Sequence, residues 1–237
     1  MFKLNVYDVP DAPTIGTATA GDGQATVSFT PSAYDGGLPI TGYTVIATPG
    51  NITATGTSSP ITVTGLANGT EYTFTVKTSN AVGVGAPSVA SKSVTPMHTS
   101  VITWSNPADI TYGTALGDAQ LNATADVPGT FAYTPAAGSV LNAGNAQAIT
   151  ATFTPTDKGN TTESKTLTIN VAKAPLTVTA SSHTITKGEN IPTIGVTYKG
   201  FVNSEDQSVL DTKPTATTSA TATRPVGEYA TIAAPLS

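Results

Sequence analysis

Short runs in which apolar and polar residues alternate recur along the whole chain. The clearest pair lies in ITVTGLANGTEYTFTV, from Ile61 to Val76. Apolar side chains occupy every second position on either side of the turn pair Asn68-Gly69, and threonine fills most of the positions between them. A period of two places one face of each run in a core and the threonine face in water. These runs therefore predict half-buried β-strands.

Similar runs predict strands before and after this stretch. Between residues 12 and 96, turn signals separate seven expected strands at spacings typical of a β-sandwich. The apolar positions that carry the alternation elsewhere are Ala25, Val27, Phe29, Tyr43, Val45, Phe131, Tyr133, Ile149, Ala151, Phe153, Leu167, Ile169, Val171, Leu176, Val178, Ile194, Val196 and Tyr198. The pattern predicts several small β domains in tandem.

Turn and linker residues divide the 237 residues into four segments. We expect an N-terminal strand or linker at residues 1–9 and β units at residues 10–96, 97–172 and 173–237. A length of 237 residues accommodates two to three domains of roughly 100 residues each.

The last unit departs from the strand pattern at residues 203–207. Ser204 with Gln207 fits a capping box, so the sequence predicts one or two helical turns through Leu210.

Composition supports an almost all-β fold. Charged residues make up 11% of the chain, against about 25% in typical proteins, and threonine, alanine, glycine and serine take their place. The net charge is −5 and the ten basic residues are scattered, which excludes an electrostatic footprint for nucleic acid. There is no cysteine, so disulfides and cysteine-ligated metals are excluded.

The chain contains no apolar stretch of the length that a signal peptide or a membrane span requires. We therefore predict no membrane insertion. The absence of a signal peptide is consistent with its removal or with a piece of a longer protein, and we expect the second.

The first unit resembles a fibronectin type III domain of the bacterial kind. The resemblance rests on VPDAPTIGTAT, ATVSFTPSAYDGGLPITGYTV, the 61–76 stretch and SNAVGVGAPS. Leu66 before Tyr72 resembles the tyrosine corner of this family, in which the phenol hydroxyl bonds to nearby backbone. Phe29 stands where the family usually has tryptophan, and the tripeptide Arg-Gly-Asp is absent.

The other two units resemble repeats of large bacterial surface proteins. The second resembles a bacterial Ig-like repeat through ITWSNPADITYGTAL, LNATADVPGTFAYTPAAGSVL and ITATFTPTD. The third resembles an MBG-type adhesin repeat through APLTVTA, YKGFVNSEDQSVL and PVGEY, but Lys187 stands where the family commonly has tyrosine before glycine. Repeats of this third kind normally run on for another strand or two, so the resemblance implies that the last unit is truncated, with an open sheet edge. The three resemblances imply tandem β-sandwich domains in a modular bacterial surface protein.

Residue types that could carry chemistry occur without the patterns that chemistry requires. The two histidines, His98 and His183, lie about one domain apart, and we expect both to be plain surface residues. Asp8 near the linker could join Asp118 or Asp126 in a calcium site only by chance, because no calcium-loop motif is present. We predict no catalytic, cofactor-binding or metal-binding residues, no cofactor, and no enzymatic activity.

Two smaller possibilities rest on lysines and aromatics. Isopeptide cross-links need a buried lysine, whereas Lys77, Lys165 and Lys173 lie at strand ends, where a solvated side chain is usual. The aromatic residues follow the strand alternation, so core packing is expected for them.

Our main hypothesis is a non-catalytic structural and adhesive stalk segment of a bacterial cell-surface or secreted protein. Its expected location is extracellular. The expected partners are other repeats of the same protein, with host or environmental glycans or proteins and self-association as further options, and no nucleic acid.

Two alternatives stay open. A glycan-binding accessory module of a polysaccharide-active enzyme requires exposed aromatics, so the exposure of Trp104, Tyr112 and Tyr133 decides it. A filament subunit would donate the alternating strand Phe2-Leu4-Val6 to the open edge of the last unit of the next subunit. The simpler explanation for both chain ends is that the chain was cut from a longer gene.

Overall fold

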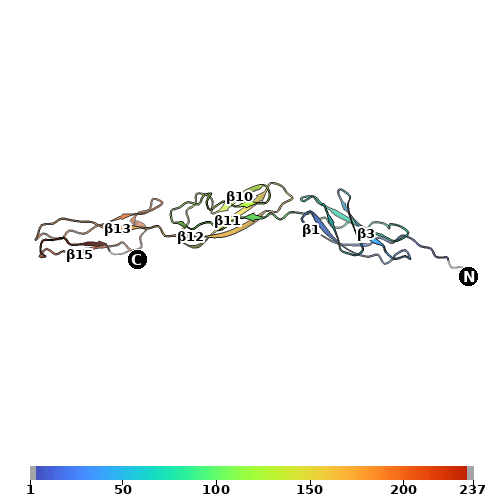
Figure 1. The fold of residues 1–237 in the computed structure, drawn as a ribbon, viewed down its shortest axis with the longest axis horizontal. Coiled ribbons are helices and arrows are strands. Elements are labelled where there is room, and N and C mark those ends of the chain that lie inside the picture. The colour runs from blue at the N-terminus through green and yellow to red at the C-terminus, as the bar shows by residue number, and fades with distance from the viewer. Residues whose placement is uncertain (1–3, 234–237) are drawn as a thin grey trace. The chain divides into compact units, whose positions relative to one another are not determined.

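The computed structural model describes residues 4–233, which form strands and a single three-residue 3₁₀ helix (Figure 1). The strands are β1 (Thr14–Gly21), β2 (Gln24–Thr30), β3 (Gly42–Thr48), β4 (Ile52–Gly56), β5 (Ile61–Thr64), β6 (Thr73–Ser79), β7 (Ile102–Thr103), β8 (Ile110–Thr111), β9 (Thr124–Ala125), β10 (Gly129–Thr134), β11 (Gly144–Pro155), β12 (Glu163–Ala172), β13 (Thr177–Ala180), β14 (Val196–Lys199), β15 (Ala216–Thr218) and β16 (Thr231–Ala233). The predicted all-β fold with several sheets is confirmed.

The chain divides into two compact units. The first comprises residues 1–105, 123–133 and 150–165. The second comprises residues 106–122, 134–149 and 166–237. The division crosses the segment 97–172, because β11 and β12 each have residues in both units. The boundaries of that predicted domain stay a prediction.

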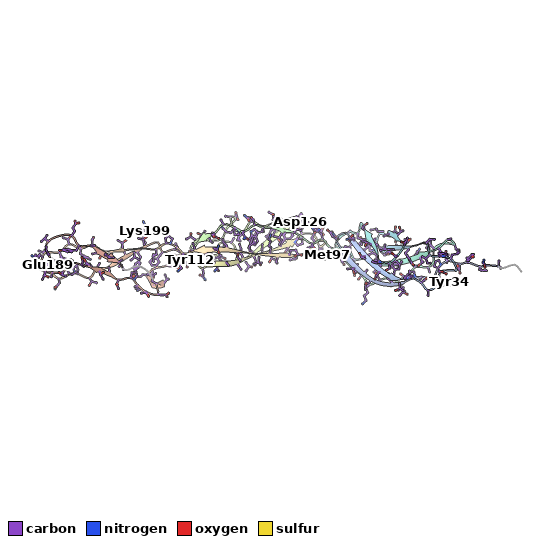
Figure 2. All side chains as sticks on the ribbon, turned by 60° about the horizontal axis from the view of Figure 1, so that its bottom comes forward. Tyr34, Met97, Tyr112, Asp126, Glu189 and Lys199 are labelled. Atoms are coloured by element: carbon purple, nitrogen blue, oxygen red, sulfur yellow. The ribbon has the colours of Figure 1, made fainter. Side chains whose placement is uncertain are left out.

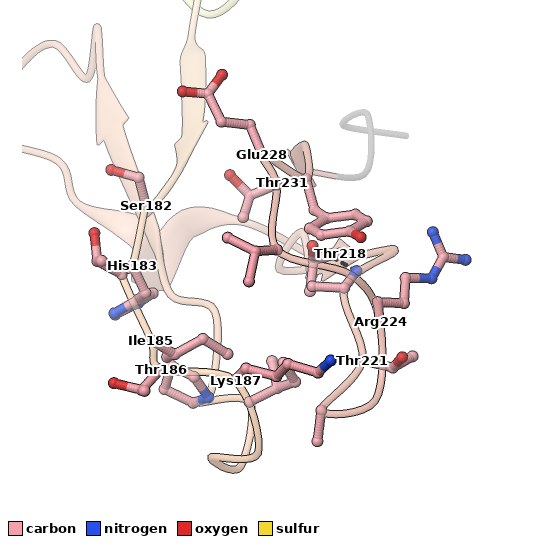
Figure 3. Close-up of a pocket in the computed structure, with 18 of the residues that line it drawn as sticks. Ser182, His183, Ile185, Thr186, Lys187, Thr218, Thr221, Arg224, Glu228 and Thr231 are labelled. Atoms are coloured by element: carbon pink, nitrogen blue, oxygen red, sulfur yellow. Dashed lines mark hydrogen bonds between the residues drawn. The ribbon is translucent and has the colours of Figure 1, made fainter.

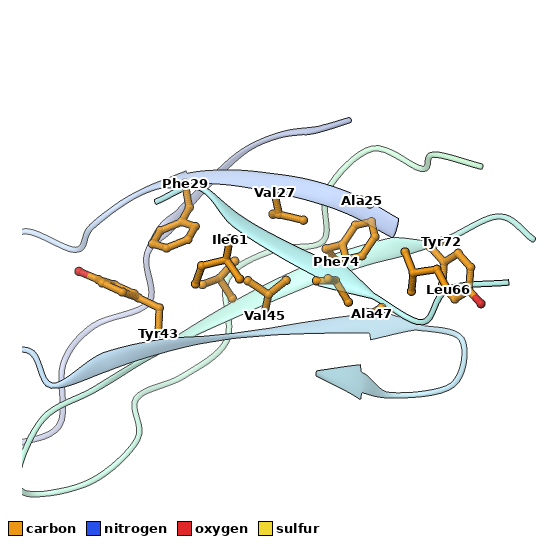
Figure 4. Packing of buried hydrophobic residues seen from close by; sticks show 12 residues of the cluster. Ala25, Val27, Phe29, Tyr43, Val45, Ala47, Ile61, Leu66, Tyr72 and Phe74 are labelled. Atoms are coloured by element: carbon orange, nitrogen blue, oxygen red, sulfur yellow. The ribbon is translucent and has the colours of Figure 1, made fainter. Parts of the chain in front are cut away.

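The first unit begins with two three-stranded antiparallel sheets, of strand order β1-β2-β5 and β4-β3-β6. The alternating apolar residues of both sheets face one another and form the core (Figure 4). Its buried members are Ala25, Val27, Phe29, Tyr43, Val45, Ala47, Ile61, Val63, Leu66, Tyr72, Phe74 and Val76. Phe29 packs against Tyr43 with ring centroids 4.7 Å apart, so the phenylalanine at the expected tryptophan position is a core residue.

The 61–76 stretch crosses from one sheet to the other, since β5 pairs with β2 whereas β6 pairs with β3. At the crossing, the backbone N–H of Ala67 donates to the Tyr72 hydroxyl at 3.1 Å. Leu66 and Tyr72 are both buried. The predicted tyrosine corner is therefore present.

The edge beyond β6 is closed by an irregular segment, residues 82–94. Backbone N–H groups along it donate to β6 and its flanks in the pairs Gly85 to Thr78, Ser88 to Val76, Ser91 to Phe74 and Val94 to Tyr72. The hydroxyls of Ser88 and Ser91 accept the N–H groups of Val76 and Phe74, each at 3.0 Å. The sandwich thus has six regular strands and one irregular edge instead of seven regular strands.

The N-terminal segment is not a strand from residue 4 onward. Leu4 and Val6 are 88% and 83% exposed, and Phe2 lies outside the described residues. Farther along, the Asp8 N–H donates to the Gly36 carbonyl at 2.9 Å. Of the two expectations for residues 1–9, the described residues fit the linker.

Beyond residue 100, a four-stranded sheet has the order β10-β11-β12-β8, and β7 pairs with β9. In the first unit, the rings of Trp104 and Tyr133 lie 5.7 Å apart and those of Phe131 and Phe153 lie 4.9 Å apart. In the second unit, β12 pairs in parallel with β8 and contributes the buried side chain of Val171.

The end of the second unit consists of two antiparallel hairpins, β13-β14 and β15-β16. Beyond Val171, Pro214 is the one buried residue among those described, so these hairpins have a shallow core. The 3₁₀ helix Gln207–Val209 is capped by Asp206, whose side chain accepts the Ser208 N–H. The predicted cap at Ser204 is wrong because Ser204 has a φ of 62°, outside the extended region that an N-cap needs.

Candidate functional site

His98 lies between two carboxylates in the first unit. Its Nδ1 is 2.8 Å from Oδ2 of Asp22, and its Nε2 is 2.9 Å from Oδ2 of Asp126. Asp22 comes from the tight turn between β1 and β2, and Asp126 directly follows β9. His98 therefore connects the sandwich to the segment that follows it. Asp126 and Met97, the neighbour of His98, are labelled in Figure 2.

Each carboxylate is also held by a second donor. Oδ1 of Asp22 accepts from the side-chain amide of Asn68 at 2.7 Å, and Oδ1 of Asp126 accepts from the N–H of Val101 at 2.8 Å. Oδ1 of Asn68 accepts the Gly23 N–H at 2.8 Å, which ties two turns of the sandwich together. Both carboxylates are thus oriented toward the imidazole.

Backbone contacts bring the same elements together. The His98 N–H donates to the Gly159 carbonyl at 2.8 Å, and the His98 carbonyl accepts the Thr161 N–H at 2.9 Å. The Gly69 N–H donates to the Pro96 carbonyl at 2.8 Å. A Cβ on Gly159 would lie 2.9 Å from Asn68, so this contact requires a residue without a side chain.

This geometry shifts the pKa values of His98 and of both carboxylates. Hydrogen bonds that the ring donates to Asp22 and, second, to Asp126 raise the pKa of His98 above its ordinary value. The pKa of Asp22 is lowered, first by His98 and then by Asn68. The pKa of Asp126 is lowered, first by the Val101 N–H and then by His98. All three shifts favour an imidazolium between two carboxylates.

The expectation that His98 is a plain surface residue is wrong. Its side chain is 29% exposed and has a partner at both ring nitrogens. The sequence contained one signal, an isolated Asp in the turn Gly21-Asp22-Gly23, but nothing in the spacing connected it to residue 98 or to Asp126. That connection depends on the way the turn abuts the linker.

The second unit contains another side-chain contact between sequence-distant loops. The Tyr112 hydroxyl donates to Oε1 of Glu205 at 2.6 Å, and this hydrogen bond raises the pKa of Tyr112. A Cβ on Gly113 would lie 2.8 Å from Val202, so the two loops are in close contact. Sequence reasoning did not pair these residues.

The remaining residues that the sequence singled out lie apart. Asp8 contacts Gly36 and Asn80 through its backbone, away from the partners of Asp126. The Lys165 ammonium donates to the Ile102 carbonyl at 3.5 Å. Among residues 4–233, no three His, Asp or Glu side chains are grouped so as to hold a metal ion.

His183 lies 2.9 Å from the Ser181 hydroxyl, two residues away. The same hydroxyl accepts the Gly195 N–H at 3.0 Å, so the serine is part of a hydrogen-bonded turn. In the described part of the chain, no carboxylate is hydrogen-bonded to His183 to complete a catalytic triad.

A cavity of about 970 Å³ lies between the loops of the two hairpins (Figure 3). Its lining mixes Ile185, Lys187 and Arg224 with several threonines, and the Arg224 guanidinium lies 5.4 Å from the ring centroid of Tyr229. The lining also includes His183, so the cavity combines apolar, cationic and hydroxyl side chains with an imidazole.

The chain has a two-layered β-sandwich followed by further small β-sheets. This arrangement defines a modular all-β protein. Residues 11–94 match the fibronectin type III domain family, and residues 176–237 match the MBG domain family of the YGX type. Both are families of non-catalytic domains, and repeats of this kind are typical of extracellular modular proteins.

Solved structures similar to this chain include domains of titin and of chicken CNTN1. A crystal structure of titin domains is 29% identical over 39% of this chain and 34% of that chain, with a TM-score of 0.34. The chicken CNTN1 FN1–FN3 domains are 13% identical over 94% of this chain and 85% of that chain, with a TM-score of 0.35. In the region described, no helix is long and apolar enough to cross a membrane.

Proposed function

We propose that this chain is a structural and adhesive stalk segment of a bacterial cell-surface or secreted protein, without enzymatic activity. The observation that carries the proposal is the way consecutive domains are connected. The linker at residues 96–98 is fixed by backbone hydrogen bonds and by the two contacts of His98. A segment that holds another module at a distance benefits from such connections, because a fixed linker transmits position and load.

The family matches support the same proposal. Fibronectin type III and MBG domains are used in series in modular proteins, and neither family supplies catalytic residues. Partners of this kind of segment would be neighbouring repeats and the surface or ligand that the whole protein contacts.

Stretching single molecules between handles at the two chain ends would test the proposal. We expect separate unfolding events, one of which releases roughly 300 Å of chain, the length of residues 11–94 when extended at about 3.6 Å per residue. Extension without any force peak would contradict a load-bearing role. Substitution of a core residue of β6 should weaken that one event and leave the others unchanged.

Glycan binding remains a second candidate, with a different surface from the one expected. Trp104 is buried, and Tyr112 and Tyr133 are half-buried with engaged hydroxyls. The exposed aromatic residues in the described part are Tyr7 and Tyr34, each about half exposed, on adjoining segments.

Affinity electrophoresis in polysaccharide gels separates this candidate from the first. A glycan platform predicts retardation that Tyr34→Ala abolishes and that Thr53→Ala, an exposed substitution on β4, preserves. Equal mobility with and without polysaccharide would remove the candidate.

Strand donation between copies is supported by the exposure of Leu4 and Val6. It predicts a particle larger than one chain by sedimentation, reduced to one chain by Leu4→Asp with Val6→Asp. A single-chain particle before substitution would exclude the filament.

A further inference from the structure

The protonation state of the His98 ring decides whether both of its carboxylate contacts can be hydrogen bonds. A neutral imidazole has one N–H donor and one acceptor nitrogen, whereas an ionised carboxylate only accepts. Both ring nitrogens of His98 lie within 2.9 Å of carboxylate oxygens. Both contacts can therefore be hydrogen bonds only when the ring is an imidazolium. In the neutral ring, one nitrogen lone pair would face a carboxylate.

The carboxylates are not free to turn away from a neutral ring. The Asn68 amide holds Asp22 at 2.7 Å, and the Val101 N–H holds Asp126 at 2.8 Å. His98 itself is fixed by backbone hydrogen bonds to Gly159 and Thr161. Loss of the ring proton must then be relieved by separation of one contact.

The two contacts differ in what they connect. His98, Asp126 and their backbone partners belong to the segments that follow Pro96, whereas Asp22 belongs to the turn of the fibronectin type III domain. The contact between His98 and Asp22 is thus the one that crosses the junction. Asp22 is also the more exposed of the two carboxylates, at 59% against 36%, so water can replace this contact more readily.

The other charged side chains on the packed elements do not supply a competing partner. Asp157 accepts the Gly159 N–H and Glu163 accepts the Thr161 hydroxyl. Lys158 and Glu71 stand exposed in the loops that carry Gly159 and Gly69. Within the described residues, the imidazole has side-chain hydrogen-bond contacts to Asp22 and Asp126.

We propose that the Asp22–His98–Asp126 bridge is a pH-dependent lock at the junction that follows the fibronectin type III domain. The lock is closed while His98 is protonated and opens at its Asp22 contact when the proton is lost. In a stalk with this lock, the domains on either side of the junction are held in one orientation at mildly acidic pH and can reorient at alkaline pH.

The direction of the pH dependence follows from the three shifts. Because the pKa of His98 is raised, its contribution is complete below the ordinary histidine value and is lost as the pH rises through the raised value. Because the pKa values of Asp22 and Asp126 are lowered, their contribution is present above the ordinary aspartate value and is lost as the pH falls through the lowered values. The lock is closed between these two limits.

An NMR titration of the full chain tests the protonation. The chain has two histidines, so their ring signals can be assigned with His183→Gln. We expect His98 to titrate above the ordinary histidine pKa of about 6.5, and Asp22→Asn or Asp126→Asn to lower that pKa. Titration of His98 at or below the ordinary value would overturn the proposal.

A distance measurement tests the opening. The chain has no cysteine, so spin labels can be placed at Thr53→Cys and Thr154→Cys, both exposed and both in the first unit. We expect a narrow distance distribution at about pH 5.5 and a broader one at about pH 9. His98→Gln should give the broad distribution at both pH values, and His183→Gln should keep the pH dependence. Equal widths at both pH values in the otherwise unsubstituted labelled chain would overturn the proposal.

Discussion

Phe74→Ala is expected to lower the free energy of unfolding of the fibronectin type III domain by about 3–5 kcal/mol. Phe74 is fully buried on β6, opposite Ala47 of β3, and its ring fills the space between the two sheets (Figure 4). Alanine would leave a cavity that the sheets cannot close, because β6 is held by β3 on one side and by Ser91 on the other. Domains of this size have a total stability of about 5–15 kcal/mol, so much of it would be lost.

Chemical denaturation followed by hydrogen exchange in residues 11–94 measures this effect. Thr75→Ala is the matched control, since Thr75 is half-buried on the opposite face of the same strand and should cost far less. The single tryptophan, Trp104, lies beyond this domain, and its fluorescence should report an unfolding transition that Phe74→Ala leaves nearly unchanged. A loss below about 1 kcal/mol would mean that the cluster is not the core on which this domain depends.

The sequence was sufficient to predict the core because alternation is a local property. Phe29, Tyr43 and Phe74 occupy apolar positions of period two, and each is buried. The tyrosine corner could also be predicted, since Leu66 and Tyr72 lie close together in sequence and the bond is to local backbone.

Contacts between sequence-distant turns could not be predicted in the same way. Asp22 and Asp126 are polar residues in loops, and no periodicity specifies that both lie beside His98. The bridge depends on the approach of Gly69 to Gly159, which sets the position of the linker. The two-residue strand β9 was missed for a different reason, because it is too short to show a pattern.

The shallow core at the end of the second unit shows where local pattern overstates burial. Val178, Val196 and Tyr198 alternate as predicted and lie on the paired strands β13 and β14, yet they are only half-buried. Alternation predicts which face of a strand is apolar, but burial depends on what covers that face. Two small hairpins cover less of each other than two full sheets do, so the same pattern yields a full core only in the sandwich.

The second large effect is expected at Gly85, where close packing of backbone rather than conformation requires glycine. A Cβ on this buried residue would overlap the Pro10 carbonyl oxygen, which is part of the backbone. Its N–H donates to the Thr78 carbonyl at 2.8 Å, so the 82–94 segment cannot move aside without losing a sheet hydrogen bond. Gly85→Ala should therefore displace residues 8–11 or that edge segment, at a cost of about 1–3 kcal/mol or more.

Hydrogen exchange distinguishes the two ways in which Gly85→Ala can be accommodated. Displacement of residues 8–11 should remove the protection of the Asp8 and Asp11 N–H groups, which donate to Gly36 and Tyr34. Gly83→Ala is the control in the same segment, since its nearest neighbour is a Val9 methyl group at 3.3 Å that can shift. If the two variants had equal stability in chemical denaturation and equal protection at both N–H groups, the packing of residues 8–11 against the sandwich would be disproved. If Gly85→Ala alone lost stability and protection at these N–H groups, residues 8–11 would be part of the folded structure of the domain. One methyl group can displace a segment in this way only if the backbone of that segment is held in place.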